Sequence, residues 1–229
     1  MVSHRLNVIG LDTSTAGVAA CALRADGRFA ERVPSPESLL GRPAHARELM
    51  PALAAVMEEA GLRWSDLDLV AVSRGPGSFT GLRIGMATAC GIADAHGIPV
   101  AGVVSLRALA EEAAPAAPPG GVLALIDARR GELFAALYAG GEELWAPAGV
   151  APEALARRLA TLPDRPLAVG DGSLRFRADL EAAGVPVAPE ASPVHVVRAL
   201  SVCRLALLAP GEPATALYLR EPDARPLDA

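Results

Sequence analysis

The fold of this chain is decided by Ser73-Arg74-Gly75-Pro76-Gly77-Ser78-Phe79-Thr80-Gly81-Leu82-Arg83-Ile84-Gly85. The apolar run before this stretch, residues 67–72, predicts a strand, and the small and apolar residues of 82–95 predict a helix. A strand, a glycine-rich turn and a helix in this order point backbone N–H groups at whatever lies above the turn. Gly75 and Gly77 allow a close approach to the backbone, and Ser78 or Thr80 is a candidate N-cap.

Two familiar phosphate-binding motifs do not match this turn. A dinucleotide fingerprint places its third glycine one position earlier than Gly81, and it needs an acid after the next strand, where residues 99–104 end without one. A Walker loop needs a lysine, and all 21 basic residues of this chain are arginine. Two interpretations stay open: the glycines serve a ligand, or they only make a tight crossover between strand and helix.

Composition bounds the class of protein. The 229 residues are 52% hydrophobic, so the chain can bury a sizeable core in one large domain or two small ones. The net charge of −5 makes it a poor candidate for the main RNA-binding surface of an assembly. The three cysteines are far apart, which indicates buried thiols in a reducing compartment.

The first half begins with three predicted strands, residues 6–11, 17–23 and 28–33. The first strand is followed by the polar turn Asp12-Thr13-Ser14-Thr15, and an order of this kind is how the actin-like and Hsp70-like ATPase fold begins. Two interpretations of Asp12 remain: it faces a phosphate, or it caps its own turn. The opening apolar run is too short for a signal peptide, and no uncharged apolar run of about 18 residues appears, so we expect a cytoplasmic protein without membrane contact.

Two helices flank the strand at 67–72. Residues 44–60 are amphipathic and end at Gly61 as a C-cap, and Pro51 predicts that this helix bends or starts late. The helix at 82–95 is almost without bulk, which favours close packing of another helix. That helix is either inside the same fold or in a second subunit.

Residues 115–121 are the clearest linker, so we predict an N-terminal lobe over 1–114 and a smaller C-terminal lobe over 115–229. The second half again begins as strand, polar turn and strand, at 122–128, 129–131 and 132–139. Residues 151–161, 174–183 and 193–208 are predicted helices, and 167–169 and 215–220 are predicted strands.

The stretch Gly75 to Gly85 resembles the signature of the bacterial TsaB (YeaZ) family, the accessory subunit of the tRNA threonylcarbamoyladenosine (t6A) synthase. Residues 11–14, 45–51, 126–132 and 217–220 are similar to the same family, and the resemblance is looser between 140 and 213. It implies an α/β fold of the actin/Hsp70-like (ASKHA, RNase H-like) class, with two lobes, mixed sheets flanked by helices, and a reduced second lobe.

The resemblance also implies two sets of site residues. The turns that would face a nucleotide contribute Asp12, Thr13, Ser14, Gly75, Gly77, Ser78, Thr80 and Gly81. The face that would pair with another subunit contributes His45, Leu49, Leu53, Leu82, Gly85, Met86 and Ala89.

A catalytic site is not expected. The related catalytic subunit, TsaD, carries a metal-binding His-x-x-x-His, and the matching positions here are Ser105 and Leu109, which cannot replace imidazole on a transition metal. The four histidines of the chain show no ligand spacing. The acids Asp127 and Glu132, or Asp12 alone, lack a basic partner nearby in the sequence. We therefore expect a pseudoenzyme with no catalytic residue, no bound metal and no required cofactor, although ATP or ADP can lie at a subunit joint.

By resemblance, the chain is a non-catalytic scaffold that activates TsaD for threonylcarbamoyl transfer to the adenosine next to the anticodon of tRNA. It would form a heterodimer with TsaD, meet a TsaE-like ATPase, contact tRNA only through the complex, and form a homodimer in isolation. Two alternatives remain: a free-standing ATPase or kinase of the same fold, for which Gly170-Asp171-Gly172 is the one candidate adenosine clamp, and a plain homodimeric binding module.

Overall fold

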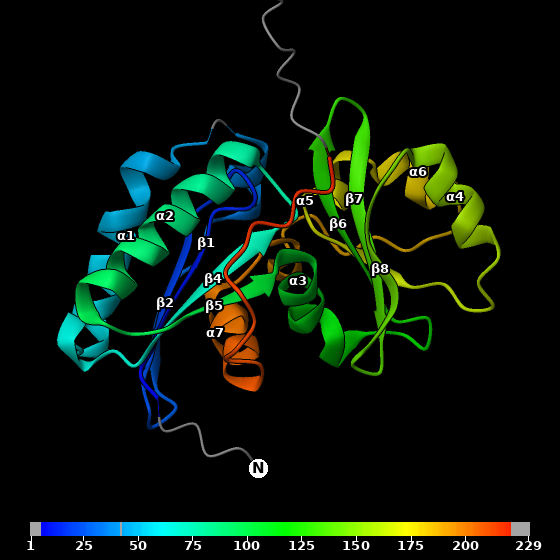
Figure 1. Ribbon diagram of the computed structural model, residues 1–229. Coiled ribbons are helices and arrows are strands. Elements are labelled where there is room, and N and C mark those ends of the chain that lie inside the picture. The colour runs from blue at the N-terminus through cyan, green and yellow to red at the C-terminus, as the bar shows by residue number, and fades with distance from the viewer. Residues whose placement is uncertain (1–5, 42, 221–229) are drawn as a thin grey trace, which may run out of the picture.

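The computed structural model describes residues 6–41 and 43–220, and two sheets organise these residues (Figure 1). The first sheet has the order β3-β2-β1-β4-β5. Its strands are β1 (Val8–Asp12), β2 (Ala19–Leu23), β3 (Phe29–Arg32), β4 (Leu69–Gly75) and β5 (Val100–Val104). The pairs β1–β2 and β2–β3 are antiparallel, whereas β1–β4 and β4–β5 are parallel. The central strands β1 and β4 are apolar and almost wholly buried, as is typical of strands covered on both faces.

The second sheet has the order β8-β7-β6-β9 and repeats the plan of the first four strands. Its strands are β6 (Val122–Arg129), β7 (Glu132–Ala139), β8 (Glu142–Val150) and β9 (Leu167–Val169). In place of a fifth strand like β5, it has a single parallel bridge between Ala168 of β9 and Val187, so the second lobe is reduced as expected. Strand β8 was not predicted, because it is an edge strand that is largely exposed and carries Pro147.

Helices form three layers around the sheets (Figure 1). On the outer face of the first sheet lie α1 (His45–Ala60) and α2 (Phe79–His96), which pack Leu53 and Ala89 into its core. Between the sheets lie α3 (Ser105–Ala113) and α7 (Ala199–Leu208). On the outer face of the second sheet lie α4 (Pro152–Ala160) and α6 (Arg177–Ala182), and the short α5 (Asp171–Arg175) follows β9.

Most predicted boundaries agree with the structure. Ser78 is the N-cap of α2, since its side chain accepts a 3.2 Å hydrogen bond from the Gly81 N–H, and Gly61 ends α1 in the left-handed conformation. Pro51 was expected to bend α1 or to delay its start, and the structure excludes the late start, because the helix already begins at His45 and Pro51 lies on its exposed side.

Three predictions in the second half are corrected. The predicted helix 174–183 is two short helices that meet at Phe176, where φ is −108° and ψ is 27°. The predicted helix 193–208 is a 3₁₀ turn, Pro193–His195, followed by extended residues and then α7, because the buried Val196 is in the extended region. Residues 215–220 run past the first sheet without forming a strand.

The division of the chain at residue 114 remains a prediction. Helix α7, from the second half, packs against β1 and β2 of the first sheet. Arg198 at its start contacts Glu31 of β3 and Glu112 of α3. The central core therefore combines residues from both halves of the sequence.

Candidate functional site between the two sheets

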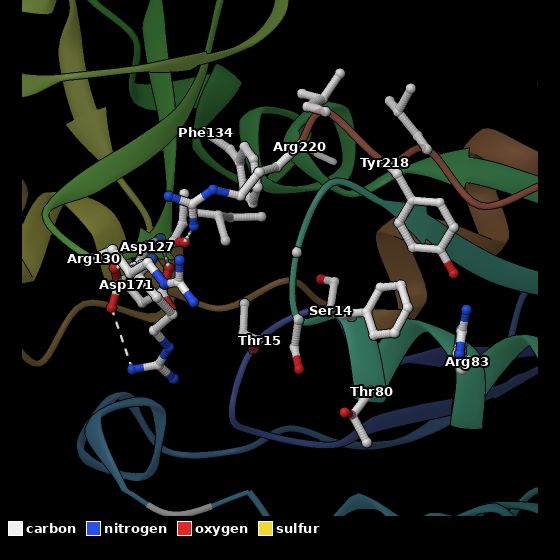
Figure 2. Close-up of a pocket in the computed structure, with 18 residues that line it drawn as sticks. Ser14, Thr15, Thr80, Arg83, Asp127, Arg130, Phe134, Asp171, Tyr218 and Arg220 are labelled. Carbon is white, nitrogen blue, oxygen red and sulfur yellow. Dashed lines mark hydrogen bonds and ion pairs between the residues drawn. The ribbon is translucent and has the colours of Figure 1, made fainter. Parts of the chain in front are cut away.

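A cleft of about 610 Å³ opens between the two sheets, on the side where β1, β4 and β6 end (Figure 2). Five segments line it: the turn after β1, the start of α2, the β6–β7 hairpin, the start of α5 and the C-terminal segment. The lining residues are Ser14, Thr15, Gly77, Ser78, Phe79, Thr80, Arg83, Ile126, Asp127, Ala128, Arg129, Arg130, Phe134, Asp171, Leu217, Tyr218, Leu219 and Arg220.

The two polar turns of the first lobe are packed directly against each other. The Ser78 N–H donates a 2.7 Å hydrogen bond to the carbonyl oxygen of Ser14, and the Thr13 hydroxyl donates a 2.8 Å bond to the carbonyl of Gly81. A Cβ atom on Gly77 or Gly81 would overlap the carbonyl oxygens of Ser14 or Thr13. These two glycines are therefore explained by contact between backbones.

This packing divides the residues expected to face a nucleotide. Ser14, Gly77, Ser78 and Thr80 line the cleft. Asp12, Thr13, Gly75 and Gly81 are buried beneath it and are absent from its lining, so only the first four of the predicted residues are open to a ligand in the cleft.

Asp12 is an internal hydrogen-bond acceptor. Its Oδ1 accepts from the Ser14 hydroxyl at 2.6 Å and from the Ser14 N–H at 3.2 Å. Burial raises the pKa of its carboxyl, because removal from water disfavours the charged form. Of the two interpretations of Asp12, the structure supports the one in which the side chain caps its own turn.

In the second lobe, Asp127 contacts Asp171, whereas Glu132 is paired with Arg220. The Asp127 N–H donates a 3.1 Å hydrogen bond to Oδ1 of Asp171, and the Asp127 carboxylate lies 3.3 Å from Arg129 and 3.6 Å from Arg175. Burial raises the pKa of Asp171 to about 7. Gly170 and Gly172 pack against β6 outside the cleft lining, so the candidate adenosine clamp contributes only Asp171 to the cleft.

Four arginines face the cleft, and the sequence did not single them out. They come from α2 (Arg83), from the β6–β7 hairpin (Arg129 and Arg130) and from the C-terminal segment (Arg220). Arg129 and Arg130 have φ values of 64° and 55°, a left-handed conformation that costs free energy in residues other than glycine and that clusters at functional sites. All four lie in stretches that resemble the family, residues 75–85, 126–132 and 217–220, but none of them was expected as a site residue.

Two aromatic rings stand at the rim of the cleft. Phe79 and Tyr218 are about 40% exposed, and their ring centroids are 5.2 Å apart. The guanidinium carbon of Arg83 lies 3.9 Å from the centroid of the Phe79 ring. In Figure 2 this group lies on the opposite side of the hollow from Asp127, Asp171 and Arg130.

The predicted pairing face lies mostly inside the fold. Leu49, Leu53, Leu82 and Ala89 are buried in the core. His45 is also buried, with Nε2 2.8 Å from the carbonyl oxygen of Thr15. Gly85 packs against the Thr13 side chain, and Met86 is half-buried. The residues predicted to pair with another subunit lie on the apolar side of each helix. In the structure, this side packs against the first sheet.

The outward side of the same two helices is exposed and built from small residues. We define the α1–α2 surface as Met50 and Ala54 of α1 with Ala87, Cys90 and Gly91 of α2, all of which are exposed. A Cβ atom on Gly91 would meet nothing within 4 Å. The sequence indicated part of this surface, because Ala87 and Gly91 belong to the helix whose lack of bulk favours close packing of another helix.

Ser105 and Leu109, which the resemblance matches to the TsaD histidines, are fully buried, at the start and in the middle of α3. The Ser105 hydroxyl has no hydrogen-bond partner. Within residues 6–41 and 43–220, no three His, Cys, Asp or Glu side chains come together as metal ligands. The same residues contain no helix long and apolar enough to cross a membrane.

The comparisons with known proteins agree with this fold. The family model of TsaD, described as tRNA N6-adenosine threonylcarbamoyltransferase, matches residues 39–174, more than half of the chain. YeaZ from Pseudomonas aeruginosa superposes with a TM-score of 0.72 at 27% sequence identity, over 93% of this chain and 100% of that structure. The chain belongs to the TsaB (YeaZ) family.

Individual relatives of this TsaB-family chain cover it to different extents. An uncharacterised protein of Mycobacterium leprae is 36% identical over 97% of this chain, which spans 57% of that relative. The tRNA threonylcarbamoyladenosine biosynthesis protein TsaB of Escherichia coli is 35% identical over 56% of this chain, which spans 58% of it. The chain thus spans just over half the length of these two relatives. The likeness to YeaZ confirms the actin-like fold class.

Proposed function

We propose that this chain takes part in t6A biosynthesis as a non-catalytic scaffold subunit of the cytoplasm. In this role it activates a TsaD-like transferase by pairing with it through the α1–α2 surface. The support for the pathway is the relative from E. coli, which is named for the biosynthesis of threonylcarbamoyladenosine in tRNA. A TsaE-like ATPase would join the pair, and tRNA would be contacted only through the complex.

The exposed side of α1 and α2 is the observation that carries this proposal. The two helices contact each other, so Ala54 and Ala87 belong to one outward layer. Small side chains let the backbone of a partner helix approach closely, which increases van der Waals contact. Gly91 costs a helix up to about 1 kcal/mol relative to alanine. Close contact with a partner at this open position offsets that cost.

The interior of the fold supports a scaffold more than an enzyme. Ser105 and Leu109 lie in the core and offer no imidazole to a metal. Asp12 is buried and bonded to Ser14, so its carboxyl is unavailable to a substrate. The free-standing ATPase or kinase would need other residues to activate a nucleophile.

A bound nucleotide is a second proposal, and the observation that favours it is the cleft between the two sheets, which shares helix α2 with the α1–α2 surface. Thr80, Arg83 and Arg130 lie at its surface, where arginine and hydroxyl groups suit phosphate oxygens. Asp12 does not fit a role in holding the metal of ATP, since it is buried. Calorimetric titration of ADP into the chain and into its complex tests this proposal, and the absence of heat in both would end it.

Reconstituted transfer tests the scaffold proposal. The chain, a TsaD-like subunit and a TsaE-like ATPase are combined with tRNA, and modified adenosine is measured. We expect transfer only when the chain and the TsaD-like subunit are both present, and we expect Ala87→Arg to reduce it at least about tenfold through steric and charge conflict. Ala182→Arg, at an exposed alanine of α6, is the matched control and should leave transfer unchanged.

Three outcomes would contradict the proposal. Transfer by the isolated chain would show a catalytic subunit. ATP turnover by the isolated chain would favour the free-standing ATPase or kinase. A stable homodimer with no effect on the TsaD-like subunit would favour a homodimeric binding module.

A further inference from the structure

After α7, the chain crosses from the first sheet to the second (Figure 1), and its residues 217–220 line the cleft. We call residues 212–220 the clasp. The Gly102 N–H donates a 3.0 Å hydrogen bond to the carbonyl of Glu212, and the Leu217 N–H donates a 2.6 Å bond to the carbonyl of Arg74. The clasp is thus fixed to the middle of β5 and to the end of β4.

The first sheet has two glycines where the clasp lies on it. A Cβ atom on Gly102 would be 2.5 Å from the carbonyl oxygen of Pro213. One on Gly75 would be 2.8 Å from the carbonyl oxygen of Leu217, and Gly75 also has a φ of 106°. Side chains at these two positions would push the clasp away from the sheet. Gly75, in the stretch that decides the fold, therefore accommodates the clasp.

The end of the clasp contacts both walls of the cleft. Tyr218 packs against Phe79 in the first turn of α2. Arg220 donates to the carbonyl of Ala128 at 3.0 Å and to the Glu132 carboxylate at 2.6 Å, at the two sides of the β6–β7 hairpin. Residues 217–220 also form part of the cleft lining.

The clasp itself is weakly held. It contains no helix or strand, and Glu212, Pro213, Thr215 and Tyr218 are exposed. Exposed segments with few buried contacts open at a lower free energy than the core does. Ala214 and Leu219 of the clasp pack against the core, but no residue of the clasp is fully buried.

We propose that the clasp is a displaceable element that couples the β6–β7 hairpin to the first turn of α2 and so controls access to the cleft. In the seated state, Tyr218 holds Phe79 while Arg220 holds the hairpin. Release frees both walls together and widens the mouth of the cleft. The proposal does not depend on the function proposed above, because each measurement uses the chain alone.

Hydrogen exchange followed by mass spectrometry tests the coupling in Tyr218→Ala and Arg220→Ala. Both residues lie on the surface, so the variants should fold, and thermal unfolding checks this. We expect exchange to rise at least about tenfold in residues 79–83 and in 129–133 in each variant, with β1 and α7 unchanged. The essential result is that Arg220→Ala affects α2 and Tyr218→Ala affects the hairpin.

Two matched controls accompany the variants. Tyr218→Phe keeps the ring and should exchange as the wild type does. Arg177→Ala removes an arginine that likewise contacts a carboxylate and a carbonyl, Glu181 and Ala188, and whose side chain is also 31% exposed. It should not affect residues 79–83.

Gly102→Ala places a methyl group against the carbonyl of Pro213, near the start of the clasp. It should also speed hydrogen exchange in residues 79–83 and 129–133. Faster exchange confined to residues 212–220 in all three variants would overturn the proposal, since the walls would then be independent of the clasp. Wild-type clasp amides that exchange as slowly as those of β1 would also overturn it, because the clasp would not open.

Discussion

The backbone N–H of Ser78 donates its hydrogen bond to the carbonyl oxygen of Ser14, at 2.7 Å. The glycine-rich turn and the turn after β1 are therefore each other's partners. A phosphate at this N–H would have to replace an existing bond, so the turn is not free to bind phosphate as a Walker loop is. The glycines that make the sequence stand out allow this contact between backbones.

Close packing of the two turns predicts opposite effects for two glycines of α2. A methyl group on Gly81 would overlap the Thr13 carbonyl, whereas one on Gly91 would meet nothing within 4 Å. We expect Gly81→Ala to reduce the free energy of unfolding by at least about 1 kcal/mol. Gly91→Ala should raise it by up to about 1 kcal/mol, because alanine favours the helix. Urea unfolding of both variants measures this, and equal effects would contradict the packing.

We expect a large loss of folding stability when the contact of Arg198 with Glu31 and Glu112 is broken. The Glu31 side chain is only 4% exposed and bonds both Arg198 and the N–H of Leu200. Arg198→Met leaves this carboxylate without its cation and should reduce stability by about 3 kcal/mol. Arg28→Met breaks the exposed pair with Asp26 and should change stability little. Comparable losses in the two variants, by chemical denaturation, would be evidence against the buried pair.

Asp171 predicts a pH dependence of stability. Its pKa of about 7 in the folded state exceeds the value of about 3.9 for an unfolded aspartate. Between about pH 4 and pH 7, the Asp171 carboxyl is therefore protonated in the folded state and ionised in the unfolded state. The free energy of unfolding falls as the pH rises through this range. Asp171→Asn cannot ionise, so the wild type should lose stability relative to it over this range and level off above it. Parallel stability curves for the two proteins would refute the assignment.

Burial of the predicted pairing face predicts the outcome of a substitution there. Ala89 is fully buried against the first sheet. A charged side chain at this position has no room and no partner, so Ala89→Arg should give insoluble protein. Soluble Ala89→Arg protein with native thermal unfolding would show that the helix is not seated on the sheet as described.

Much of the fold could be predicted from the sequence, because apolar periodicity and glycine turns act locally. The strands of the first sheet and the N-cap at Ser78 are examples. Strand β8 was missed since an exposed edge strand needs no alternation of apolar residues. The break at Phe176 depends on packing from other parts of the chain, which no local pattern records.

The candidate site was less predictable. Ser14, Gly77, Ser78 and Thr80 were expected at a ligand site, and they line the cleft. Arg83, Arg220 and the hairpin arginines reach it from segments far apart in the sequence, so only the fold brings them together. The apolar faces of α1 and α2 were expected to bind a partner. In the structure these faces pack against the first sheet of the same chain, which is what an amphipathic helix usually does with its apolar side.

We propose that the α1–α2 surface binds a TsaD-like subunit. Light scattering coupled to size-exclusion chromatography, over a concentration series of the two proteins, tests it directly. We expect the wild type and Ala182→Arg to form a one-to-one complex. Ala87 is exposed on the α1–α2 surface, so Ala87→Arg should associate at least about tenfold more weakly. Association of Ala87→Arg with wild-type affinity, or no complex with the wild type, would contradict it.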